Sequence, residues 1–230
     1  MPLHGHVYTA PDGLRGFDTA KALKPGVAAA FFEHGYRYVV RYVRRDKAHP
    51  FDLNASEAES ILEVGLGLMV VQYVESEDSW KPTKSKGVAH GETAGAEAER
   101  IGVPSGVTLW CDLEGVAVGT SATDVIEYCN QWHQAVASAG YVPGLYVGWH
   151  AGLNATQLYR SVRFTHYWGA YNLNADQAPV VRGLQMKQSE RRPIDAVPGA
   201  KFEFQTDRVR TDALGGRPTL LAPEHWFELL

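Results

Sequence analysis

Two acidic residues, Asp112 and Glu114, have types and a spacing that could support catalysis. They follow the apolar run of residues 107–111. Residues i and i+2 of a strand point to the same side, with Cα atoms about 6.5–7 Å apart, so both acids could face one substrate. Two carboxylates this close push their pKa values apart, so that one can stay protonated while the other is ionised. Glycoside hydrolysis needs this division between two carboxyl groups.

The same pattern has two other interpretations. D-x-E is common by chance, and these acids could simply form the polar edge of a buried strand. Alternatively, Glu114 could be the acid while Asp112 orients it or binds a substrate amide. The elements around the pair decide how much weight the catalytic interpretation deserves.

Eight short apolar, β-branched or aromatic stretches predict strands. They cover residues 14–20, 36–43, 66–74, 107–114, 141–149, 164–172, 182–190 and 201–209. Amphipathic stretches with capping residues predict helices between most neighbouring strands, and a polar segment predicts a loop. The helices cover residues 24–35, 53–65, 90–102, 121–140 and 154–162, and the loop covers residues 75–87.

This alternation of strands and helices predicts parallel strands joined by right-handed crossovers. We therefore predict an α/β fold, a single (β/α)8 TIM-type barrel over residues 1–230, with a doubly wound open sheet as the alternative. The 230 residues are close to the length of about 250 that is usual for this barrel. Helical patterns are weak between the last three strands, so we expect the last two units to be irregular.

Polar and aromatic side chains gather at the predicted carboxyl ends of the strands, which form the reactive mouth of such a barrel. Two further acids there are Asp18 and Asp207. The amides and aromatic residues are Gln72, Tyr73, Tyr146, Trp149, Trp168, Tyr171 and Gln188. Amides and carboxylates can bind the hydroxyl edges of a sugar, and aromatic rings can stack on its faces. The mixture favours a carbohydrate groove or a polar small-molecule pocket.

Composition and motifs argue against several other classes. A net charge of -4 disfavours a nucleic-acid or membrane-surface binder. No apolar run approaches the roughly 18 residues of a membrane helix. The histidines lack ligand spacing and no phosphate-binding glycine motif is present, so we expect neither a metal nor a cofactor. The N-terminus shows no signal-peptide pattern, so we expect a cytoplasmic, phage-associated or non-classically exported protein of undetermined oligomeric state.

A set of motifs, in this order along the chain, resembles a known domain. The glycoside-hydrolase-like barrel domain of bacteria and phages, long catalogued as a domain of unknown function, is itself similar to the family-25 lysozymes, the N-acetylmuramidases. The motifs are GFDTA, YVVRYV, LMVVQYVES, VTLWCDLEG, GLYVGWHAG, YWGAYN, LQMKQS and FEFQTDRVRTDALGG. The resemblance covers residues 14–223 and implies a TIM-type barrel with a sugar-binding groove at its mouth.

The resemblance also implies roles for individual residues. Glu114 is the expected general acid, assisted by Asp112. Asp18 matches the acid after the first barrel strand, and Asp207 is a candidate for the acid of the last strand. Aromatic and amide positions of strands five, six and seven are matched by Tyr146, Trp168 and Gln188.

The function so implied is a glycosidase that cleaves a β-linked amino-sugar polymer such as peptidoglycan, so the expected partner is a glycan. The alternative is a non-catalytic carbohydrate-binding or phage structural module on the same barrel. A phosphodiesterase-like or deacetylase-like barrel enzyme is a third option, and it would need metal ligands or a histidine pair at the mouth.

Overall fold

Eight strands form one closed barrel, and two further strands form an antiparallel pair with each other. The computed structural model describes residues 2–76 and 78–230, and in this part of the chain ten strands share one sheet. Their bounds are β1 (His6–Thr9), β2 (Arg15–Thr19), β3 (Tyr38–Val43), β4 (Gly67–Gln72), β5 (Thr108–Leu113), β6 (Val142–Val147), β7 (His166–Gly169), β8 (Met186–Arg192), β9 (Phe204–Val209) and β10 (Thr219–Ala222). The eight predicted strands are β2 to β9.

Pairing of β4 with β5 closes these eight strands into a ring. The predicted TIM-type barrel is therefore confirmed. One strand departs from the expected direction, because β9 runs antiparallel to both of its neighbours, β2 and β8. No helix reverses the chain between β8 and β9, which are joined by residues 193–203, so the last strand returns in the opposite sense.

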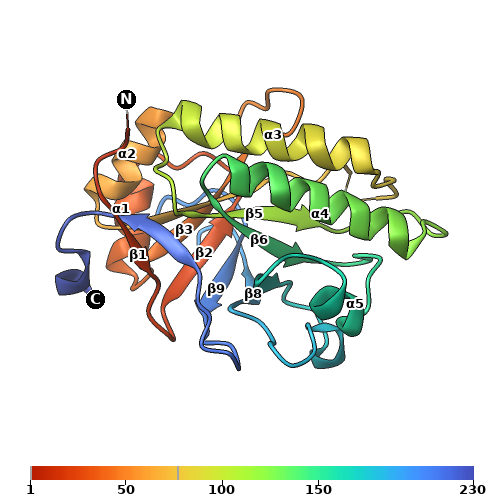
Figure 1. Cartoon of the computed structure of the whole chain (residues 1–230). Coiled ribbons are helices and arrows are strands. Elements are labelled where there is room, and N and C mark those ends of the chain that lie inside the picture. Colours follow the sequence, from red (N-terminus) through yellow and green to blue (C-terminus); the bar gives the residue numbers. More distant parts are fainter. Residues whose placement is uncertain (1, 77) are drawn as a thin grey trace.

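Helices cover the outside of the barrel between the earlier strands (Figure 1). They are α1 (Pro25–Glu33), α2 (Ala55–Glu63), α3 (Lys84–Ile101), α4 (Ala122–Ser138) and α5 (Ala155–Arg160), with short 3₁₀ turns η1 (Ala175–Gln177) and η2 (Trp226–Leu229). Only η1 lies between β7 and β8 in the described residues, so the irregularity expected of the last units is confirmed. Across the described residues, no helix has the length and apolar character needed to cross a membrane.

Helix α3 begins earlier than its sequence pattern predicts. Thr83 caps it, and the helix occupies residues 84–89, which we expected to be loop or unassigned. Glycines at four-residue spacing in α3 obscure the helical pattern but have a packing role. A Cβ at Gly87 would collide with the backbone of Tyr128 on α4, and one at Gly91 would lie 2.8 Å from Ala135. The glycines therefore let α3 and α4 pack side by side, as Figure 1 shows.

The end of the barrel away from the mouth is sealed by β10, which pairs with β1. Leu221 of β10 pairs with Leu68 in the lower part of β4. On the other side, Thr219 donates two hydrogen bonds, from its backbone N–H to Thr108 Oγ1 at 2.9 Å and from its hydroxyl to the Gly106 carbonyl at 2.6 Å. Since β4 and β5 pair directly only through their upper residues, β10 fills the gap between their lower halves.

The barrel interior is filled by large rings set against glycines. Gly16 on β2 lies opposite Tyr38, and Gly144 on β6 lies opposite Trp110; a Cβ on either glycine would collide with the facing ring. Close packing of this kind leaves no room for extra atoms. The lower interior is therefore a packed floor, and polar side chains stand above it.

Candidate active site

Alternation along the strands places three carboxyl groups on the inner face of the barrel. Asp18 lies near the end of β2, Asp112 near the end of β5, and Asp207 within β9. All three are at least 95% buried. Because β9 is antiparallel, its register puts Asp207 opposite Gln188 of β8. The structure thus gathers acids from strands far apart in the sequence.

Asp18 and Asp207 form a carboxyl pair that is held from both sides. Their side chains contact each other. Trp168 Nε1 donates to Asp207 Oδ1 at 2.9 Å, and Gln188 Nε2 donates to Asp18 Oδ2 at 2.9 Å. Burial raises the pKa of Asp18 from 3.8 to about 7. Burial, and then the charge of Asp18, raise the pKa of Asp207 well above its usual value. Two adjacent buried carboxyls resist double ionisation, so the pair holds a proton near neutral pH.

Gln188 links this pair to the aromatic wall. Its Oε1 accepts a hydrogen bond of 3.1 Å from the Tyr146 hydroxyl and one of 3.2 Å from the Tyr171 backbone N–H. With Nε2 donating to Asp18, the Gln188 amide is fixed at both ends. Tyr146 is fixed too, because its ring lies 4.6 Å from that of Trp168.

Glu114 stands above this layer at the mouth, just after β5, and is half-buried. Its backbone carbonyl accepts a 2.6 Å hydrogen bond from the Trp80 indole. Its side chain lies over Gly148: a Cβ there would collide with Glu114 Oε2 and would lie 2.8 Å from the Tyr146 ring. The missing side chain at Gly148 therefore makes the space that the Glu114 carboxyl occupies.

The charges of the acids raise the pKa values of two tyrosines at the mouth, Tyr42 and Tyr146. The pKa of Tyr146 is raised by burial and then by the charges of Glu114, Asp112, Asp18 and Asp207. Burial also raises the pKa of Tyr42, and the charges of the acids on β2 and β5 add to it. Asp18, Asp112 and Glu114 therefore act on both tyrosines, and Asp207 also acts on Tyr146. Clusters of perturbed titratable groups of this kind are typical of functional sites.

The other predicted site residues lie at different depths. Trp149 and Tyr171 are 51% and 52% exposed at the rim, so their rings could meet a ligand. Tyr73 is half-buried, with its ring 4.7 Å from that of Tyr42. Trp168 is 1% exposed and lies below the acids, where it positions Asp207. Its place under the site is a correction to the expectation that it lines a sugar groove.

Gln72 is a second correction, because its side chain does not reach the mouth. Its Oε1 accepts a 2.8 Å hydrogen bond from the Trp132 indole, and its Nε2 donates to the backbone carbonyl of His90 at 2.8 Å. Val71 takes the inner face of β4, so the next residue points outward toward α3 and α4. Gln72 therefore connects β4 to the helices and points away from the mouth.

Of two further residues of the site, one follows from the sequence and one does not. Tyr42 stands at the carboxyl end of a predicted strand and shares the inner face of β3 with Tyr38 and Val40, so the period of two along YVVRYV places it at the mouth. Gly148 follows Tyr146 by two positions on the same face. No sequence pattern marks it as functional, because its role depends on where the neighbouring Glu114 side chain lies.

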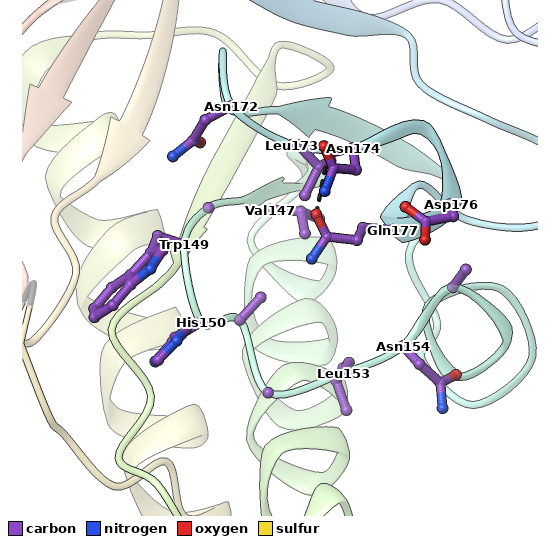
Figure 2. Close-up of a pocket in the computed structure, with 14 residues that line it drawn as sticks. Val147, Trp149, His150, Leu153, Asn154, Asn172, Leu173, Asn174, Asp176 and Gln177 are labelled. Atoms are coloured by element: carbon purple, nitrogen blue, oxygen red, sulfur yellow. Dashed lines mark hydrogen bonds between the residues drawn. The ribbon is translucent and has the colours of Figure 1, made fainter.

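A pocket of about 670 Å³ opens beside Gly148, between the segment after β6 and the segment after β7. Its polar lining residues are Trp149, His150, Asn154, Asn172, Asn174, Asp176 and Gln177 (Figure 2). The size is in the range of sites for small ligands. Among the described residues, no group of three or more His, Cys, Asp or Glu side chains could hold a metal ion.

Comparisons with known proteins agree with this architecture. The model of the Rv2525c-like, glycoside hydrolase-like domain matches residues 29–193. No curated protein matches the sequence. The fold is similar to the Tat-secreted protein Rv2525c of Mycobacterium tuberculosis in complex with HEPES, at 16% identity and TM-score 0.62 over 86% of this chain and 95% of that one.

A lysozyme and an autolysin also share the fold. A bacterial lysozyme from Streptomyces coelicolor is 12% identical, with TM-score 0.59 over 89% of this chain and 95% of that one. The modular autolysin LytC of Streptococcus pneumoniae, solved with a synthetic peptidoglycan ligand, is 11% identical, with TM-score 0.58 over 85% of this chain and 46% of that one. The resemblance drawn from the ordered motifs is thereby confirmed.

Proposed function

The chain belongs to the Rv2525c-like, glycoside hydrolase-like domain family, and from this premise we propose that it hydrolyses a β-linked amino-sugar polymer such as peptidoglycan. One observation carries the proposal: three buried carboxyl groups on the inner face of the barrel lie below a half-buried Glu114, whose side chain lies over Gly148 beside the Tyr146 ring. The likeness to a lysozyme and to an autolysin that binds a peptidoglycan ligand supports this substrate class.

Glu114 is the general acid of the proposed reaction. Its carboxyl gives its proton to the glycosidic oxygen as the bond from that oxygen to the anomeric carbon breaks. A water molecule supplies the hydroxyl that the anomeric carbon gains, and a carboxylate accepts the proton that this water loses. Asp112, on the same inner face of the barrel, assists Glu114. Asp18 and Asp207 lie deeper, and they stabilise the positive charge that develops on the sugar ring.

The partner in this proposal is a wall glycan. Trp149 and Tyr171 supply exposed rings at the rim for sugar faces. Tyr73 and Tyr146 complete the wall of the mouth. Gln188 acts indirectly, by holding Asp18 and Tyr146.

The test is release of reducing ends and loss of turbidity from purified cell walls. Wild-type protein should release reducing ends, and Glu114→Gln should lower the rate by about 10²–10⁴-fold, the usual contribution of a positioned acid. Glu127→Gln, an exposed acid on α4, is the matched control and should keep the wild-type rate.

Failure of wild-type protein to cleave walls from several sources, or equal rates for wild type and Glu114→Gln, would contradict the proposal. Wall binding that is measured by co-sedimentation and is unchanged in Glu114→Gln would then identify a non-catalytic carbohydrate-binding module. The deep burial of Asp18, Asp112 and Asp207 is the feature that favours this second candidate.

A further inference from the structure

Trp80, in the segment between β4 and α3, is bonded directly to the backbone of the proposed acid. Its ring is 3% exposed, and its indole N–H donates to the Glu114 carbonyl at 2.6 Å. A buried indole N–H that lost its partner would cost stability, so this bond is part of the fold. The small exposed fraction leaves no ring surface for a sugar, so an effect of Trp80 on a reaction must pass through the residues that it contacts.

The backbone of Trp80 is bonded to the same stretch of chain. Its N–H donates to the Gly115 carbonyl at 3.1 Å, and its carbonyl accepts from the Ala117 N–H at 2.8 Å. It also pairs with Val116 in an isolated parallel bridge. The indole N–H, the backbone N–H and the carbonyl of Trp80 are thus all bonded to residues 114–117, and Trp80 contacts this segment as one residue of an added strand would.

The opposite edge of this segment is bonded to the chain that follows β6. The Gly115 N–H donates to the Trp149 carbonyl at 2.8 Å, and the Val116 N–H donates to the His150 carbonyl at 3.0 Å. Glu114 lies one residue beyond the end of β5. The backbone around the acid is therefore held between two flanking chains, one of which contributes the indole bond.

Trp80 is itself anchored to the helices outside the barrel. Its ring meets the Tyr128 ring of α4 edge to face, with centroids 5.0 Å apart, and the Tyr128 hydroxyl lies 3.2 Å from His90 Nδ1 on α3. Lys86 Nζ lies over the indole, 5.9 Å from its centroid. A side chain that is locked by packing can hold a neighbouring group in place. The contacts therefore run from the helix pair through Trp80 to Glu114.

We propose that Trp80 is a positioning residue for Glu114: its indole N–H fixes the Glu114 backbone and thereby keeps the carboxyl over Gly148. This rests on the proposed function and adds a residue that lies behind the mouth. A shift of about 1 Å in a reacting group can lower a rate by about 100-fold. Loss of the indole bond should therefore slow proton transfer and leave substrate affinity unchanged.

The experiment compares two Trp→Phe substitutions. Trp80→Phe keeps an aromatic ring against Tyr128 and keeps the backbone bonds, but it removes the indole N–H. Trp132→Phe is the matched control, because Trp132 is also buried and its indole N–H donates to Gln72 Oε1 at 2.8 Å on the outer face of the barrel. Each variant loses one buried hydrogen bond and some ring volume, so both should lower the melting temperature by a similar amount, about 5 °C.

The kinetic constants separate the two variants. With soluble, uncross-linked peptidoglycan as substrate, Trp80→Phe should lower kcat by about 10- to 100-fold and keep KM within about twofold of the wild-type value. Trp132→Phe should keep both constants, since its lost bond does not reach the acid. A merely structural role for Trp80 would predict the same kinetics for both variants.

Two further measurements do not depend on cleavage. Hydrogen exchange at the backbone N–H groups of residues 115–117 should be about five- to tenfold faster in Trp80→Phe, because one bond that holds this segment is gone. The NMR resonance of the Glu114 carboxyl carbon, assigned by comparison with Glu114→Gln, should also move. In Trp132→Phe both should match the wild-type protein.

The outcomes separate this inference from the proposed function. If wild-type protein cleaves no wall, the proposed function fails, while faster exchange and a shifted carboxyl resonance in Trp80→Phe still support the positioning of Glu114. Unchanged exchange or an unmoved resonance overturns the inference whether or not walls are cleaved. In an active protein, a kcat of Trp80→Phe equal to that of wild type, or an equal loss in Trp132→Phe, overturns it as well.

Discussion

Two buried polar clusters lie on opposite faces of the same strands. On the outer face, Arg41 donates to both carboxylate oxygens of Glu57, at 2.7 and 3.2 Å, and also to the Thr19 backbone carbonyl at 2.6 Å. On the inner face, Asp18 contacts a second carboxyl, Asp207, and burial raises both pKa values. Opposite charges meet in the outer cluster, and like charges meet in the inner one.

This contrast separates a structural polar cluster from a reactive one. A buried ion pair with each partner hydrogen-bonded stabilises one arrangement of the chain and is inert. Two buried carboxyls side by side cost stability and store a titratable proton. The outer cluster holds the Thr19 backbone, which follows Asp18, so it also positions the inner one.

The largest expected effect concerns the outer ion pair. Arg41→Ala leaves the Glu57 carboxylate buried without its main partner, and this should lower the free energy of unfolding by about 3–5 kcal/mol. Urea denaturation measures it. Replacing both partners, as Arg41→Met with Glu57→Leu, should recover most of that loss. A loss below about 1 kcal/mol would show that the pair does not stabilise the outer face.

The next prediction concerns Gly148→Ala, which adds a methyl group beside the inner cluster and leaves its charges unchanged. The new methyl group must displace the Glu114 carboxyl or the Tyr146 ring, so the rate of wall hydrolysis should fall by about 100-fold. Gly26→Ala is the matched control, because open space surrounds a Cβ there. Unchanged hydrolysis by Gly148→Ala would mean that the placement of Glu114 is not limiting.

Two buried glutamines allow a paired test of the outer and inner faces. Gln72→Ala leaves the Trp132 N–H and the His90 carbonyl without their partner, so unfolding free energy should fall by about 1–3 kcal/mol while the rate per folded molecule stays the same. Gln188→Ala should instead lower that rate, because it releases Asp18. Thermal unfolding and wall-hydrolysis assays on both variants check the contrast, which an activity loss in Gln72→Ala would break.

The smallest effect is the pH dependence of stability that the carboxyl pair causes. The pKa of Asp18 is about 7 in the folded protein and near 3.8 when unfolded, so the folded state binds more protons between these values. Stability from this site is therefore greatest at low pH and falls as pH rises from about 4 to about 7. Burial also raises the pKa of Asp207, so it too binds a proton in the folded state in this window. Asp207→Asn removes this proton binding and should reduce the fall in melting temperature across the window by about 4 °C.

Melting temperatures at pH 4.5 and 7.5 test this prediction. Asp78→Asn, an exposed acid in the loop before α3, is the control and should keep the wild-type slope. An Asp207→Asn slope equal to that of wild type would mean that the two carboxyls do not share a proton.

The barrel could be predicted because its signals are local. Each inner strand is a short β-branched or aromatic run, and capped amphipathic helices mark the crossovers. The pair Asp112 and Glu114 follows from the period of two along β5. Asp18 and Asp207 were named from strand ends and from the resemblance to a family. Their contact could not be predicted without the register of the antiparallel β9.

The features that could not be predicted from the sequence depend on contacts between elements. Gln72 looked like a mouth residue because it ends a strand, but the inward turn of Val71 sends it outward. Trp168 was expected to bind substrate, whereas it is 1% exposed and donates to Asp207. The early start of α3 was masked by Gly87, whose role lies in its approach to α4. Each error concerns which side of an element faces which neighbour.

The position of β10 between the lower halves of β4 and β5 has a consequence for the order in which the barrel assembles. Thr219 bonds to Thr108 and Gly106, partners more than a hundred positions earlier in the chain. During synthesis the gap between the lower halves of β4 and β5 therefore stays open until residues 219–222 have been made. Long-range closure of this kind is slow and leaves strand edges exposed in the meantime. Until then the growing chain carries a barrel that is not fully closed.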